Sequence, residues 1–310
     1  MTSLEAEPLL DVDELLSSIE RVPVDRDALA STEDSHEHRA VAHGLLRETA
    51  QLVALAAGII VGERPAWTRN EAILGGHLVR MAKLLRWVLE EIGRDRQDLL
   101  FMALRATGEC IINFRYLLRH GSDELFDSYV HESLQSDFQL EDLINRNVAA
   151  RGGETIPIER RMLASIERDR RTAGVTREAI PTKRIRNLGG KNVFERARDL
   201  GAESMYYPVF AGPSRMVHGG WKDLTMHHLD ASDDGTFVPR MEGRTPSIQP
   251  LYALGVLTSE ALEEYVHEVS HPELAPVMKR VHEVFDRLVI ADALHEEFLV
   301  RRQERSSGSS

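Results

Sequence analysis

Residues 95–120 read DRQDLLFMALRATGECIINFRYLLRH, and this stretch decides the fold. Wound as a helix, it carries apolar side chains around most of its circumference: Leu99, Leu100, Met102, Leu104, Ile111, Ile112, Phe114, Leu117 and Leu118. A helix that is apolar on nearly all sides is buried. The stretch therefore predicts the central helix of an all-α protein, and Gly121 supplies its stop.

Helical patterns also lie on both sides of this stretch. The residues Thr68-Arg69-Asn70-Glu71 form a capping-box sequence that opens a helix to about residue 92. Further helices are predicted at about 36–61, 122–150, 157–172, 191–200, 203–218, 247–269 and 273–301. Pro208 and Pro213 should kink or split the segment 203–218. Residues 219–247 are predicted to form a long loop, with a small hairpin around 233–235.

These elements predict one multi-helix, bundle-like domain over residues 31–300. Residues 1–30 are acidic and are expected to form a loosely ordered arm. Residues 301–310 end in ERSSGSS and are expected to form a flexible tail.

The charge balance limits the classes of partner. The net charge of −12 argues against a general nucleic-acid binder. The charge is uneven, however, because residues 158–198 contain twelve Lys or Arg and five Asp or Glu. Such a segment can bind an anion on an acidic protein. The alternative is an Arg-rich helix pair whose charges form internal ion pairs.

Cysteine usage and hydropathy point to a cytoplasmic protein without a membrane partner. Cys110 is the only cysteine, so an intramolecular disulfide and a Cys-based zinc site are excluded. The acidic amino terminus does not resemble a secretory signal. The most apolar stretch, residues 52–62, is too short to span a bilayer as a helix.

A polar row interrupts the central helix. Arg105, Glu109 and Asn113 follow one another at intervals of four residues and share one helical face. Polar groups buried without partners cost about 1–3 kcal/mol each, so this row must be paired, solvated or functional. Its structural interpretation is an ion pair between Arg105 and Glu109 that sets helix packing.

A second polar set follows in residues 206–220. Ser214 and His218 are four residues apart, with Tyr207 upstream and Arg215 between them. His218 can act as a general acid or base near neutral pH, and Arg215 can hold a phosphate. The structural interpretation is that His218 caps helix carbonyls and Ser214 bonds to the preceding turn.

Two other chemistries fit the sequence less well. A Ser–His hydrolase would need a G-x-S-x-G elbow on a sheet, and neither is found. Glu33-x-x-His36 and Glu268-x-x-His271 have the spacing of di-iron helix bundles, but both lie near predicted helix ends. Surface histidine clusters are the better interpretation, and no metal or cofactor is expected.

Two motifs together resemble a known family. Arg105-x-x-x-Glu109, followed by Tyr116-Leu117, and Ser214-x-x-x-His218-Gly219 are similar to the bacterial family of unknown function catalogued with the number 5677, over roughly residues 70–220. The resemblance implies an all-helical fold and no established activity. A looser similarity is to HEPN-type helical dimers of toxin and antiphage systems, whose ribonuclease members place His four to six residues after Arg. Here the spacing from Arg215 to His218 is shorter.

Two functional hypotheses follow. In the first, the protein is a metal-independent ribonuclease or phosphodiesterase of a defence system: His218 is the acid/base, Arg215 contacts phosphate, and Arg105 and Glu109 orient them. Tyr207, Ser214 and Asn113 would complete the binding cleft. In the second, the same residues hold a small anionic ligand or a partner segment without catalysis. A homodimer is expected in either case.

Overall fold

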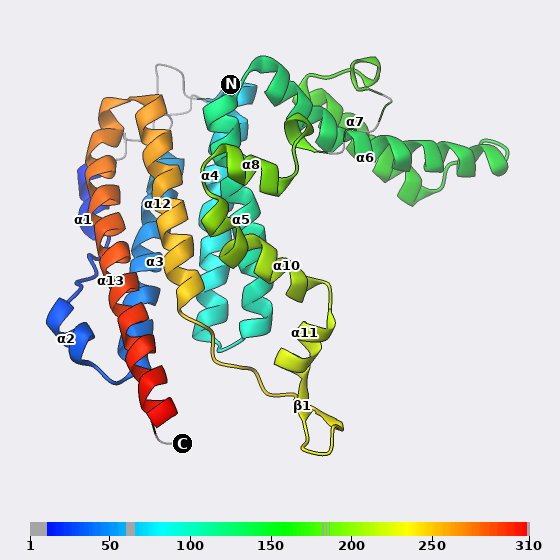
Figure 1. The fold of residues 1–310 in the computed structure, drawn as a ribbon. Helices are drawn as coiled ribbons and strands as arrows, with labels where there is room; N and C mark the ends of the chain where they lie inside the picture. Colours follow the sequence, from blue (N-terminus) through cyan, green and yellow to red (C-terminus); the bar gives the residue numbers. More distant parts are fainter. Residues whose placement is uncertain (1–10, 60–65, 182, 184, 186, 309–310) are drawn as a thin grey trace.

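A computed structural model describes residues 11–59, 66–181, 183, 185 and 187–308. The architecture is all-α, as predicted, with one small two-stranded hairpin. Five long helices form the main bundle (Figure 1): α3 (Ser35–Gly58), α4 (Arg69–Gly93), α5 (Gln97–His120), α12 (Gln249–Val269) and α13 (Ala275–Gly308). Among the helices that the structure describes, none combines the length and the apolar composition that spanning a bilayer requires.

Helix α5 is central, as the apolar run predicted. It packs against α4 and α12 within the bundle and against the later segments that cover its remaining face. Its buried residues include Leu104, Ile111, Phe114 and Leu117, each almost fully excluded from solvent. Burial on this scale supplies the largest favourable contribution to folding. The helix therefore fixes the position of the polar row that it carries.

Helices α6 (Asp123–Ala150) and α7 (Pro157–Ala173) project away from the bundle (Figure 1). They are held together by ion pairs: Arg170 and Arg177 both contact Glu141, at 2.9 and 2.6 Å. These two arginines of the basic segment 158–198 therefore form internal ion pairs, which is the alternative to an anion site that the sequence left open. Arg161, in contrast, is exposed and has no ion pair among the described residues.

The described part of the amino-terminal arm is docked on the bundle. It contains α1 (Val12–Ser18) and α2 (Arg26–Ser31), and Leu16, Ile19 and Leu29 are buried. These three apolar side chains explain why an acidic segment packs closely. At the other end, α13 continues through Gly308, so residues 301–308 are helical. Residues 1–10 and 309–310 lie outside the described part, and the division into arm, domain and tail stays a prediction.

Residues 177–239 form a series of short elements between α7 and α12. In chain order they are η1 (Arg177–Ala179), η2 (Leu188–Gly190), α8 (Val193–Asp199), α9 (Glu203–Tyr206), η3 (Tyr207–Ala211), α10 (Gly212–Val217), α11 (Trp221–Asp223), η4 (Leu224–His228), β1 (Leu229–Ala231) and β2 (Phe237–Pro239). The strands pair antiparallel, which confirms the predicted hairpin. A last short helix, η5 (Pro272–Leu274), joins α12 to α13.

The prolines divide the segment 203–218, as predicted. Pro213 has no N–H to donate to the carbonyl of Val209, so the regular helical pattern fails there. Instead, the Gly212 N–H donates to the carbonyl of Tyr207, five residues back, and η3 is a π-helix. The loop predicted for residues 219–247 contains α11, η4 and the hairpin, so only part of it is irregular.

Two histidines lie against each other in the core between α3 and α13. The rings of His38 and His295 are 5.2 Å apart, and both side chains are almost completely buried. Both ring nitrogens of His38 and Nδ1 of His295 lack hydrogen-bond partners among the described residues. Burial, with the charge of His38, lowers the pKa of His295 from 6.5 to about 4. Both rings are therefore neutral at pH 7.

This pair makes stability sensitive to acid. Between pH 6.5 and 4 the unfolded chain binds a proton at residue 295 that the folded chain excludes, so the free energy of unfolding falls as pH falls. The pKa difference predicts a loss of about 3 kcal/mol across that interval. Urea unfolding at pH 7, 5.5 and 4.5 measures it. His295→Phe should flatten the profile, and an unchanged profile in that variant would assign the loss to other groups.

Candidate functional site

Arg105, the first residue of the polar row on α5, faces the π-helix η3. The guanidinium carbon of Arg105 lies 5.3 Å from the centre of the Phe210 ring, a cation–π contact. Among the described residues no ion pair joins Arg105 to Glu109. The ion pair considered as a means of setting helix packing is therefore not formed. Nε of Arg105 and Oδ1 of Asn113 are buried without hydrogen-bond partners in the described chain.

A glycine on α5 permits this close approach. A Cβ atom at Gly108 would lie 2.8 Å from the carbonyl oxygen of Val209 and 2.9 Å from its Cγ2. Real Cβ atoms do not make contacts this short, so a larger residue would push η3 away from α5. Because α10 also packs against α5, one helix supports the whole second polar set.

The same face of α5 meets a buried arginine that the sequence analysis did not single out. Arg196 of α8 is 5% exposed, and Nη1 donates to the carbonyl of Lys191 at 2.6 Å. Desolvation lowers the pKa of Arg196, and the nearby carboxylates of Glu132 and Glu109 oppose that effect. Neither carboxylate is within ion-pair distance in the described residues. The signal available in the sequence was an arginine among Phe194, Ala197 and Leu200 in a short segment that is otherwise largely charged.

Desolvation also acts on the acidic partner of this cluster. It raises the pKa of Glu132, while the charge of Arg196 lowers it and that of Glu109 raises it. The cluster therefore combines the guanidinium of Arg196 with the carboxylates of Glu109 and Glu132. Both α8 and η3 pack against α5, the helix that carries Glu109.

The second polar set lies at the surface, along η3 and α10. Tyr207 is 59% exposed, Arg215 and His218 are exposed, and Ser214 is half-buried. In the described chain none of the side chains of Ser214, Arg215 and His218 makes a hydrogen bond or ion pair. The capping role considered for His218 and the back-bonding role considered for Ser214 are thus not formed.

Exposed aromatic side chains continue along this surface. Trp221, at the start of α11, is 63% exposed, and its ring contacts Phe237 of β2 edge-on, with centres 5.3 Å apart. At the other end, the Tyr206 ring packs against Tyr207 and Phe210 at 5.6 and 5.2 Å. Tyr207 and Trp221 therefore flank Arg215 and His218 along the chain. Tyr207 was predicted as a site residue from the sequence, whereas Trp221 was not.

The two Glu-x-x-His motifs do not form metal sites. Within the described residues there is no group of three or more His, Cys, Asp or Glu side chains placed to hold a metal ion. Glu33 instead contacts Arg305 at 2.7 Å, and Nδ1 of His271 lies 3.9 Å from Glu273.

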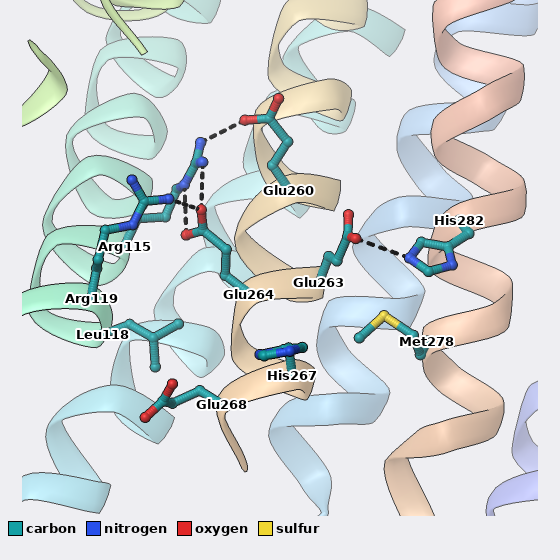
Figure 2. Close-up of a pocket in the computed structure, with 10 residues that line it drawn as sticks. All are labelled: Arg115, Leu118, Arg119, Glu260, Glu263, Glu264, His267, Glu268, Met278 and His282. Atoms are coloured by element: carbon teal, nitrogen blue, oxygen red, sulfur yellow. Dashed lines mark hydrogen bonds and ion pairs between the residues drawn. The ribbon is translucent and has the colours of Figure 1, made fainter. Parts of the chain in front are cut away.

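A cavity of about 570 Å³ opens elsewhere, between α5, α12 and α13 (Figure 2). Its wall contains an ion-pair network in which Arg115 contacts Glu260 at 2.6 Å and Glu264 at 2.8 Å. This cavity could not be predicted from the sequence, because Arg115 of α5 and Glu260 of α12 are 145 residues apart.

A comparison with protein families places the chain. The profile of a family of unknown function (DUF5677) matches residues 71–237, more than half of the chain. The chain belongs to this family, which confirms the resemblance drawn from Arg105, Glu109, Ser214 and His218. No curated protein and no solved structure gives a significant match. The matched segment runs from α4 to β2 and includes both polar sets, the buried Arg196 and Trp221.

Proposed function

We propose that this protein binds single-stranded RNA along the surface of η3, α10 and α11. The observation that carries the proposal is the pattern of exposed groups in residues 207–221. Arg215 and His218 have no protein partner in the described residues, and along the chain they lie between two exposed aromatic residues, Tyr207 and Trp221. We refer to this set of four residues as the 207–221 surface.

The chemistry of the surface suits an unpaired nucleic-acid strand. Bases of any sequence stack on aromatic side chains, and cations between the aromatics contact the phosphates. Tyr207 and Trp221 supply the stacking faces, and Arg215 supplies a guanidinium fork that matches phosphate. An RNA duplex offers no such access, because its bases are stacked inside the helix.

The overall charge requires that binding be local. A net charge of −12 repels polyanions at long range, so affinity must come from short-range stacking and a few phosphate contacts. The proposal therefore predicts a shallow salt dependence, since few counterions are released. Local binding of this kind needs exposed aromatic side chains for stacking and does not need a large basic patch.

Cleavage of the bound strand is a second candidate function, favoured by the position of His218. An exposed imidazole without a protein partner can exchange a proton with a ligand. At a phosphodiester it would take the 2′-hydroxyl proton as the 2′-oxygen bonds to phosphorus; the bond to the 5′-oxygen breaks, water protonates that oxygen, and Arg215 stabilises the phosphate charge. Arg105 and Glu109 act through η3 and α5 as positioning residues.

Titration with a fluorescently labelled single-stranded RNA of roughly a dozen nucleotides tests the proposal. Trp221→Ala should weaken binding about 5- to 100-fold, because one stacking contact is lost. Arg215→Ala should weaken it and lower the salt slope by about 0.7. Fluorescence anisotropy at several salt concentrations measures both effects.

Arg161→Ala is the matched control, because Arg161 is exposed and unpaired but lies on α7. The RNA affinity of this variant should equal that of the unmodified protein. If Arg161→Ala weakened RNA binding and Arg215→Ala did not, the RNA site would lie on the projecting helices instead. Measuring the affinity for a single-stranded DNA of the same sequence shows whether the surface prefers RNA or binds any single strand. Products formed in the presence of EDTA report cleavage, and His218→Ala should abolish them without abolishing binding.

A further inference from the structure

The cavity between α5, α12 and α13 shares no lining residue with the 207–221 surface. Its volume of about 570 Å³ lies within the range of small-molecule pockets. Leu118 and Met278 contribute apolar surface, and the other side chains around them are charged or imidazole groups. Figure 2 shows these side chains converging from three helices on one space.

The ion pairs in the wall do not neutralise it. Arg115 is buried and is paired with both Glu260 and Glu264, and Arg119 donates to Glu264 at 2.5 Å. Four glutamates line the cavity, and both arginines form their ion pairs with two of them, Glu260 and Glu264. Within the described residues, the imidazole of His282, at 3.0 Å, is the only side-chain partner of Glu263.

Glu268 has no partner at all among the described residues, and His267 beside it has no side-chain hydrogen bond there. Glu263 and Glu268 are thus the carboxylates left for a ligand. They are five residues apart on α12, which places them about 7.5 Å apart along the helix axis and about 140° apart around it. In Figure 2 they lie on either side of His267.

We infer that this cavity binds a linear aliphatic diamine or polyamine. Its two ammonium groups lie on Glu263 and Glu268, and its methylene chain lies against Leu118 and Met278. An anion is disfavoured because the wall carries four carboxylates against two guanidiniums. A bare metal ion is disfavoured because the described residues offer no group of three or more ligands for one.

Isothermal titration with cadaverine, and with pentylamine as the single-charge analogue, tests this site. Cadaverine should bind with one-to-one stoichiometry and at least tenfold more tightly than pentylamine, because only the diamine reaches both carboxylates. Glu268→Gln should weaken cadaverine at least fivefold. This side chain is exposed and unpaired in the described protein, so the variant should fold.

Glu297→Gln is the matched control, because it removes the same charge from an exposed, unpaired position on α13 outside the cavity. Its cadaverine affinity should equal that of the unmodified protein. The inference is overturned if cadaverine shows no saturable binding, or if Glu268→Gln and Glu297→Gln behave alike, because binding would then follow net charge only. RNA binding does not involve this cavity, so either result leaves the proposed function untouched.

Discussion

Replacing Glu48 by alanine should lower the free energy of unfolding by about 3–5 kcal/mol, the largest single effect expected in this protein. Glu48 is fully buried in α3 and accepts bonds from Arg280 at 2.9 Å and from both terminal nitrogens of Arg287 at 2.8 Å. It also accepts the backbone N–H of Val22 at 3.0 Å. Without the carboxylate, two largely buried guanidiniums would lose their counterion.

Urea unfolding followed by circular dichroism measures this effect. Glu297→Ala is the control, because that carboxylate is exposed and has no ion pair in the described chain; it should change stability by less than about 0.5 kcal/mol. Burial alone would raise the pKa of Glu48, but the hydrogen bonds from Arg287, Val22 and Arg280 outweigh it and lower the pKa. The stabilisation is therefore present above the unfolded-state pKa and is lost as pH falls through the folded one. Equal stability of the two alanine variants would contradict this account.

Gly108→Ala should be destabilising by about 1–3 kcal/mol and should also weaken RNA binding. Alanine is normally the better helix residue, by about 1 kcal/mol. Here its Cβ would lie 2.8 Å from the carbonyl oxygen of Val209, which belongs to the backbone and cannot rotate away. The separation of η3 from α5 would displace Tyr207 and the start of α10.

The control for this variant is Gly76→Ala on α4, where an added Cβ meets nothing within 4 Å. That variant should keep or slightly raise the melting temperature and should leave RNA affinity unchanged. If Gly108→Ala were as stable as Gly76→Ala, the contact between α5 and η3 would not be as close as the structure has it.

Local signals in the sequence predicted the helices well. The apolar run of residues 95–120 predicted a central helix, and α5 is central because apolar side chains on several faces must all be covered. The capping box at Thr68 forms, with the Glu71 side chain accepting the Thr68 N–H. The hairpin forms around residues 232–236, where turn residues are concentrated.

Contacts between distant segments could not be predicted in the same way. Glu48 meets Arg287 across 239 residues, and Glu260 meets Arg115 across 145, and no spacing rule covers such distances. The polar row of α5 was found because helical periodicity places its members on one face. Arg196 and Trp221, which complete the surroundings of the site, come from short elements without periodicity. The expected homodimer and cytoplasmic location stay predictions.

Photochemical cross-linking of single-stranded RNA to the unmodified protein, mapped by mass spectrometry, tests the central claim most directly. The account predicts adducts at Tyr207 or Trp221, because these are the exposed rings on which bases would stack. Adducts confined to the projecting helices α6 and α7, or none at an RNA concentration that saturates binding, would contradict the 207–221 surface as the RNA site.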